Sequence, residues 1–200
     1  MKGCLSLVFK IIIVILAYIG FQSLGGVDFV KEKFNEYTVP TQETLIEQTK
    51  SIANFSNINK EYILDRNVKL FKYQAVLAEH KASGQKIAII DPKDNELISK
   101  KDFKTGEIDK KLKDLNDKFQ YQLVRFENFE ITKKGTMHAF NQKVPYVRFE
   151  ADTVNLPIGH VAGIIGIAEN KNGDNVILAS MNGDDKYSQI ITEGFFKNVK

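Results

Sequence analysis

The chain has 200 residues, 43% hydrophobic and 26% charged, a composition typical of one globular domain with a short appendage. A single cysteine excludes a disulfide scaffold, and three histidines without a run of cysteines lack the usual ligand set of a structural zinc site. The formal charge is +3, but Lys2 and Lys10 lie in the apolar N-terminus, which leaves 26 of the 28 basic residues against 25 acidic ones. A chain so balanced has no electrostatic reason to bind nucleic acid, so we expect no nucleic-acid partner.

The N-terminus carries an apolar run that indicates a membrane segment. No charge interrupts Ile11–Phe21, and Leu5–Val27 reaches the ~20 residues of a spanning helix if Lys10 snorkels to the interface. A cleaved secretory signal is the alternative, with the small residues Ser23 and Gly25 before the cut. We favour an uncleaved anchor because no Ala-x-Ala pattern is present, and both interpretations export the rest of the chain.

The short basic N-terminus resembles a signal anchor, which predicts a single-pass membrane protein with its C-terminal domain outside the cytoplasm. Secretion after signal cleavage is the alternative localisation. The expected organisation is a membrane anchor or signal over residues 1–26, a stalk and helical segment over 27–60, and an extracytoplasmic α+β domain over 61–200.

Two helices are predicted directly after the anchor. Residues 27–37 form a short stalk helix with apolar side chains at helical spacing, namely Phe29, Val30, Phe34 and Tyr37. A second helix begins at Pro40-Thr41, has Glu43 in its first turn, and continues to about Asn54.

Alternating apolar residues predict strands over the rest of the chain. The first two are Val68–His80, with a bulge near Leu70, and Ile87–Ile90. A helix over Glu107–Phe119 follows, and then five strands are expected over Tyr121–Thr132, Thr136–Asn141, Pro145–Thr153, His160–Glu169 and Asn175–Met181, with a turn at Lys133-Lys134-Gly135. A final helix is expected to have an apolar face of Tyr187, Ile190, Ile191 and Phe195. We therefore predict an α+β fold in which a mostly antiparallel sheet packs with helices, behind an N-terminal transmembrane or signal helix.

The layout of Tyr62–Lys200, an antiparallel meander closed by an amphipathic helix ending in FFKNVK, resembles the PsbP/DcrB-like α/β/α sandwich. The resemblance implies an accessory module that binds lipid or protein rather than a catalyst. It has no diagnostic motif, so it transfers no functional residue.

One rim of the predicted meander gathers chemistry-bearing residues. If the last three strands are consecutive antiparallel neighbours, Asp152, His160 and Asn182 share one rim, with Asp184 beside them. A His–Asp pair can act as a general acid–base pair or bind a metal, whereas a rim histidine bonded to its own loop is the structural alternative. We expect the structural role, and therefore no catalytic residue, cofactor or metal.

The absence of common catalytic motifs favours a membrane-anchored, non-catalytic accessory or binding module. Its partners would be the membrane, through residues 5–27, and an envelope protein or apolar ligand. Two alternatives stay open: an envelope hydrolase or metal-dependent enzyme using His160, Asp152 and Asp184, and a carrier of a small apolar ligand.

Overall fold

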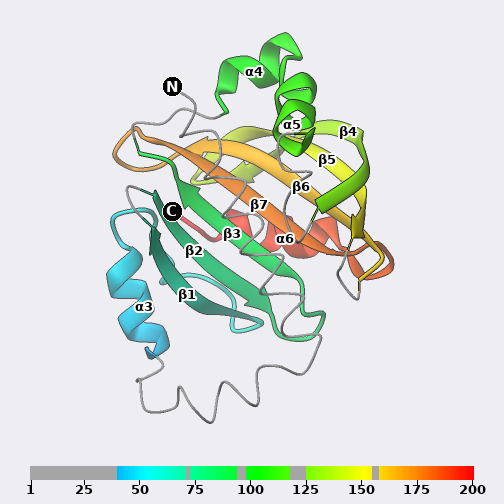
Figure 1. The fold of residues 1–200 in the computed structure, drawn as a ribbon. Coiled ribbons are helices and arrows are strands. Elements are labelled where there is room, and N and C mark those ends of the chain that lie inside the picture. Colours follow the sequence, from blue (N-terminus) through cyan, green and yellow to red (C-terminus); the bar gives the residue numbers. More distant parts are fainter. Residues whose placement is uncertain (1–39, 71–72, 94–97, 118–124, 155–157) are drawn as a thin grey trace.

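The computed structural model describes residues 40–70, 73–93, 98–117, 125–154 and 158–200. Their strands form one seven-stranded sheet in the order β1-β2-β3-β7-β6-β5-β4, and every neighbouring pair is antiparallel (Figure 1). The strands are β1 (Tyr62–Leu70), β2 (Tyr73–His80), β3 (Lys86–Asp91), β4 (Arg125–Ala139), β5 (Gln142–Val154), β6 (His160–Glu169) and β7 (Asn175–Gly183). The helices are α3 (Gln42–Thr49), α4 (Lys100–Thr105), α5 (Ile108–Asp117), the 3-10 turn η1 (Asp184–Lys186) and α6 (Gln189–Lys197).

The predicted α+β class is wrong for the described residues. About half of them lie in strands and fewer than a quarter in helices, none longer than ten residues. Within these residues we find no helix with the length and apolar character needed to cross a bilayer. The predicted span over residues 5–27 and the stalk helix over 27–37 lie outside the described residues.

The sheet has seven strands, as many as the sequence predicts, but one expected break between strands is absent and one unexpected break is present. Lys133-Lys134-Gly135 forms no turn: Lys134 pairs with Val147 and Gly135 with Tyr146, inside the 15-residue strand β4. The two irregularities of β4, between Glu127 and Glu130 and between Ile131 and Lys133, both precede this polar stretch, and the pairing after them is regular to Ala139. The single strand predicted over Val68–His80 is instead the end of β1 followed by β2, with Leu70 opposite Tyr73.

Helix α3 closes the β1 edge of the sheet. Its N-cap Thr41 accepts a hydrogen bond from the Thr44 amide. The side-chain amide of Gln42 then donates to the Leu64 carbonyl oxygen (2.6 Å) and accepts from the Leu64 amide (2.8 Å), taking the place of a neighbouring strand. The described chain therefore begins at the β1 edge.

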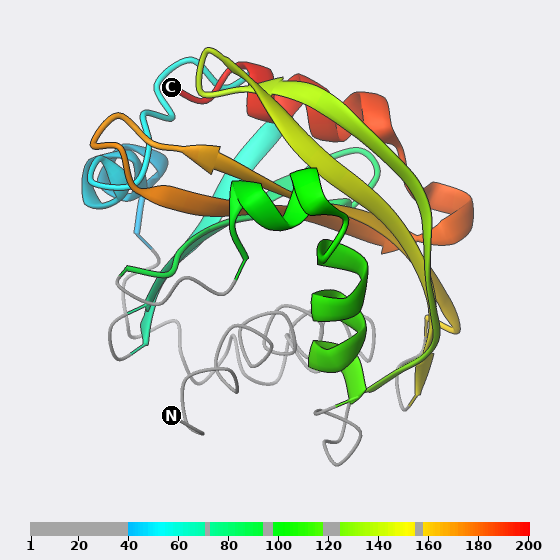
Figure 2. The ribbon, with the colours of Figure 1, turned by 90° about the horizontal axis from the view of Figure 1, so that it is seen from above.

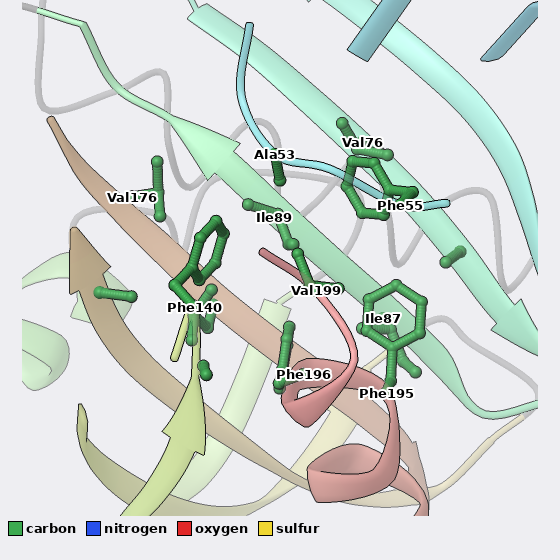
Figure 3. Close-up of a cluster of buried hydrophobic side chains, with 14 of the residues drawn as sticks. Ala53, Phe55, Val76, Ile87, Ile89, Phe140, Val176, Phe195, Phe196 and Val199 are labelled. Carbon is green, nitrogen blue, oxygen red and sulfur yellow. The ribbon is translucent and has the colours of Figure 1, made fainter. Parts of the chain in front are cut away.

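The outer face of the curved sheet is closed by α6 and by the segment after α3 (Figures 2 and 3). Phe195 and Phe196 of α6 are buried with Phe55, Ile87 and other side chains of the outer core. The aromatic rings meet at an angle, with 5.5 Å between the ring centroids of Phe195 and Phe196.

Ile190 does not belong to the apolar face of the last helix, contrary to the sequence prediction. Its side chain is 84% exposed, and Thr192 occupies a fully buried position of the helix instead. The hydroxyl of Thr192 can be buried in the core because it has polar partners there. It donates a hydrogen bond to Ser180 Oγ at 2.9 Å and accepts one from the side-chain amide of Gln85 at 2.7 Å.

These residues belong to a buried polar network that fixes α6 to the sheet. The Gln85 amide also donates to Ser180 Oγ and to the Ser188 carbonyl oxygen, both at 3.0 Å. Gln85 Oε1 accepts a hydrogen bond at 2.8 Å from the backbone amide of Ser188, and Ser188 is the N-cap residue of α6. Both the nitrogen and the oxygen of the Gln85 side-chain amide thus have hydrogen-bond partners, and this network holds α6 rigidly against the outer face of the sheet.

The inner face of the sheet carries α4 and α5, which Figure 2 shows inside its curve. A capping box between Ser99 and Asp102 starts α4, and Gly106, at φ 78°, ends it in the left-handed conformation that glycine favours. Helix α5 buries Ile108 and Leu112, one turn apart, against the inner core. α4 packs mainly on β5 and on α5, and α5 mainly on β4.

Candidate functional site

The β5–β6 hairpin brings together the acid and the imidazole that the sequence places at one rim. Asp152 of β5 lies directly opposite His160 of β6, as the predicted antiparallel order of these strands requires. Asp152 Oδ1 lies 2.7 Å from His160 Nδ1, and the two side chains are 41% and 43% exposed. The pair is therefore accessible to solvent, and its two residues are neighbours in the β5–β6 ladder.

A third residue, Asn128 of β4, completes this cluster. Its side-chain amide donates to Asp152 Oδ2 at 2.6 Å. Asn128 has a φ of 50° in the irregular stretch between Glu127 and Glu130, a left-handed conformation that asparagine tolerates better than most residues. The bulge turns its side chain toward β5, which regular alternation in the sequence does not predict.

The cluster favours the charged form of its carboxylate. The hydrogen bond from His160 lowers the pKa of Asp152 below its usual range, and the hydrogen bond from Asn128 adds to this effect. The carboxylate in turn orients the imidazole ring by binding Nδ1.

Of the other two predicted rim residues, Asn182 does not join this cluster. Asn182 of β7 donates from its amide to the Ser83 carbonyl oxygen at 3.1 Å and accepts from the Gly183 amide at 2.9 Å. These bonds tie the end of β7 to the β2–β3 turn and to its own backbone. The backbone of Asp184 begins η1, but its side chain lies outside the described part of the structure.

The His160–Asp152–Asn128 cluster can hold a ring nitrogen in a fixed direction at the protein surface. This arrangement serves a general base, and it also serves a histidine that orients a polar ligand. Across the described ranges, no three His, Cys, Asp or Glu side chains are grouped so as to hold a metal ion.

The inner face of the sheet is a second candidate site. Its centre is lined by small and aliphatic side chains that are all buried: Ala75 and Leu77 of β2, Ala88 and Ile90 of β3, and Ala179 of β7. Gly163 of β6 continues this surface, and a methyl group there would lie 2.8 Å from the Phe149 ring.

Helices α4 and α5 lie over one end of this face, where ion pairs add to the burial of Ile108 and Leu112. Lys111 of α5 contacts Asp102 of α4 at 2.7 Å, and Lys134 of β4 contacts Asp109 of α5 at 2.7 Å. Both side chains of the second pair are more than two-fifths exposed, so this pair adds only about 1 kcal/mol or less. In the first pair the Asp102 carboxylate is buried.

Neither a protein-family model nor a curated protein matches the chain. The layout resemblance to PsbP/DcrB-like domains therefore stays a prediction.

Proposed function

We propose that this protein is a membrane-tethered, non-catalytic binding module that receives an acyl chain on the inner face of its sheet. The observation that carries the proposal is the contrast between the two faces. The outer face is sealed by aromatic packing and by the Gln85–Thr192 network, whereas the inner face is apolar and is covered at one end by two short helices rich in charged residues.

Entry into the interior suits this protein better than docking of an apolar partner on its outer surface. In the described residues, Ile190 is the large hydrophobic side chain that is exposed. From β2 to β5 the inner face spans four strand spacings, or about 19 Å, which suits an elongated apolar chain. The predicted anchor would hold the domain beside a source of such chains.

Photoaffinity labelling in membranes tests this proposal. The full chain is reconstituted in phosphatidylcholine vesicles with a palmitic acid that carries a diazirine, and labelled residues are mapped by mass spectrometry. We expect label on β2 and β3 residues of the inner face, such as Leu77 and Ile90. Label confined to residues 5–27, or absent from the domain, would contradict the proposal.

A matched pair of variants makes the test specific. Ala88→Leu fills the inner face and should reduce domain labelling by about fivefold or more, because an added side chain in this space costs at least about 1 kcal/mol. Ala78→Leu places the same side chain in the outer core, where Ala78 is also buried. Its labelling per folded molecule should equal that of the wild type.

The His160–Asp152 contact favours a second candidate function, a hydrolase that uses His160 as general base. An esterase or phosphatase activity with small chromogenic substrates would need to be present in the wild type and lost in His160→Ala. Activity that survives in His160→Ala would exclude this rim as its source.

A further inference from the structure

One cross-strand row of the inner face begins with an ion pair and continues with apolar residues. Lys86 of β3 and Glu79 of β2 lie directly opposite each other, and Lys86 Nζ contacts Glu79 Oε2. From Lys86 the row continues through directly opposite residues of β7, β6 and β5 (Figure 1), which are Met181, Gly163 and Phe149. The row therefore has a charged end and an apolar remainder.

Regular alternation places this ion pair on the inner face. Ala88 follows Lys86 by two positions and belongs to the inner core. Leu77, two positions before Glu79, belongs to the same core. The pairing of β2 with β3 and of β3 with β7 contains no register shift, so the alternation is unbroken. Met181, opposite Lys86, is also an inner-core residue.

Lys86 brings a positive charge next to this apolar surface, where little solvent reaches it. Its side chain is 11% exposed, and that of Glu79 is 23% exposed. An ammonium group carries three N–H donors, and its hydrogen bonds to a carboxylate are stronger where water is scarce, so a ligand carboxylate would compete with Glu79 for them. From Lys86 to Phe149 the row spans three strand spacings, or about 14 Å, along which an acyl chain would lie on Met181, whose unbranched side chain adapts its shape.

We infer that Lys86 binds the carboxylate of the acyl ligand, which makes a free fatty acid the ligand class of the inner face; this inference rests on the proposed function. The carboxylate of a fatty acid is joined directly to its chain, as the neighbouring positions of Lys86 and Met181 require. The phosphate of a phospholipid is separated from its acyl chains by glycerol, and an ester offers no charge to the ammonium group.

The test compares two photoaffinity probes that differ mainly in charge, a palmitic acid that carries a diazirine and its methyl ester. The full chain is reconstituted in phosphatidylcholine vesicles, and labelling of the inner face is measured against probe concentration, relative to label in the lipid. The wild type should prefer the acid. Lys86→Met, which removes the charge but keeps an unbranched side chain, should weaken labelling by the acid about tenfold or more and leave labelling by the ester unchanged.

Glu79→Gln separates ligand binding from a purely structural role of the ion pair. Removal of the competing carboxylate should strengthen labelling by the acid about threefold or more. A structural pair would instead make Glu79→Gln and Lys86→Met change this labelling in the same direction. Lys100→Met is the matched control, because Lys100 is also paired with a glutamate, Glu169, at 2.8 Å but lies on α4 outside this row. It should change neither labelling.

Labelling by the ester also reports whether a variant keeps its inner face. If Lys86→Met loses it, the double variant Glu79→Gln/Lys86→Met, which leaves no unpaired charge, replaces it; it should bind the ester like the wild type and show no preference for the acid. Equal labelling of the wild type by the two probes, or a preference for the acid that survives without Lys86, would overturn the inference and leave the acyl site in place. Inner-face labelling by neither probe would reject the acyl site and this inference with it.

Discussion

The side-chain amide of Gln85 donates a 2.7 Å hydrogen bond to the hydroxyl of Thr192, and both residues are completely buried although 107 positions separate them. Gln85→Leu keeps most of the volume but removes the partner of the Ser188 amide and of two buried hydroxyls. We expect it to lower the free energy of unfolding by about 2–3 kcal/mol, measured by urea denaturation.

Gln142 provides the control for this measurement. Its amide also donates to a carbonyl oxygen, that of Glu169, but at an exposed position. Gln142→Leu should cost about 0.5 kcal/mol or less. Equal losses in the two variants would show that the Gln85 network does not fix α6.

Gly163 tests how tightly the inner face is packed. An added methyl group would press on the Ser180 carbonyl oxygen of β7, which cannot move without disturbing the β6–β7 ladder, and on the Phe149 ring. Gly163→Ala should therefore destabilise the fold by about 3 kcal/mol in chemical denaturation. Gly159→Ala meets no atom within 4 Å and should be nearly neutral; a comparable loss there would refute the packing argument.

Asp102 should make the α4–α5 pair sensitive to acid. Burial alone would raise the pKa of Asp102, but hydrogen bonds from Lys111 and from the backbone and side chain of Ser99 outweigh it and lower this pKa. A carboxylate with a lowered pKa stabilises the fold fully above its unfolded pKa of about 3.9, and this contribution is lost as the pH falls through the folded value.

Wild type should therefore melt at a higher temperature than Asp102→Asn at pH 7, and the difference should shrink as the pH falls below about 4. Thermal melts followed by circular dichroism measure it. Asp114→Asn, on the exposed side of α5, is the control and should melt like the wild type. A difference for Asp102→Asn that stays constant with pH would contradict the assignment.

The two hydrogen bonds to Asp152 should differ in how far they lower its pKa. The bond from His160 lowers the pKa of Asp152 more than the bond from Asn128 does. Carboxyl NMR titrations should therefore show a higher pKa for Asp152 in both single variants, with the larger rise in His160→Ala than in Asn128→Ala. The reverse order would mean that Asn128 is the main partner of the carboxylate.

The sequence predicts local features of this fold better than its class. The helix over residues 107–119 is present as Ile108–Asp117, because its apolar residues recur at i, i+4 and i+7. The long strand β4 could not be predicted, since the Lys133-Lys134-Gly135 run has the composition of a turn, and only pairing with β5 keeps it extended. Tertiary pairing therefore outweighs local turn preference, and this shifts the fold from α+β toward one large sheet.

The rim could be predicted in part for a similar reason. Strand order and a short loop are enough to place Asp152 opposite His160. Asn128 lies at an irregularity of β4, where the period of two fails, so no alternation pattern points its side chain at β5. Asn182 lies at the expected end of β7, but its side-chain amide donates a hydrogen bond to the Ser83 carbonyl oxygen in the β2–β3 turn. The sequence does not predict this contact, because the two segments are far apart along the chain.

The strand order also has a consequence for how the chain acquires its structure. β1, β2 and β3 form one meander of local hairpins and β4 to β7 form another, and the ladder that pairs Ala88 with Ala179 joins them. Contacts between distant segments form slowly, because the intervening chain must first lose entropy. Until β7 arrives, β3 presents an open edge that includes Ile87, Ile89 and Ile90, which can recruit a strand from a neighbouring nascent molecule. Formation of the β3–β7 ladder thus decides between the native fold and aggregation.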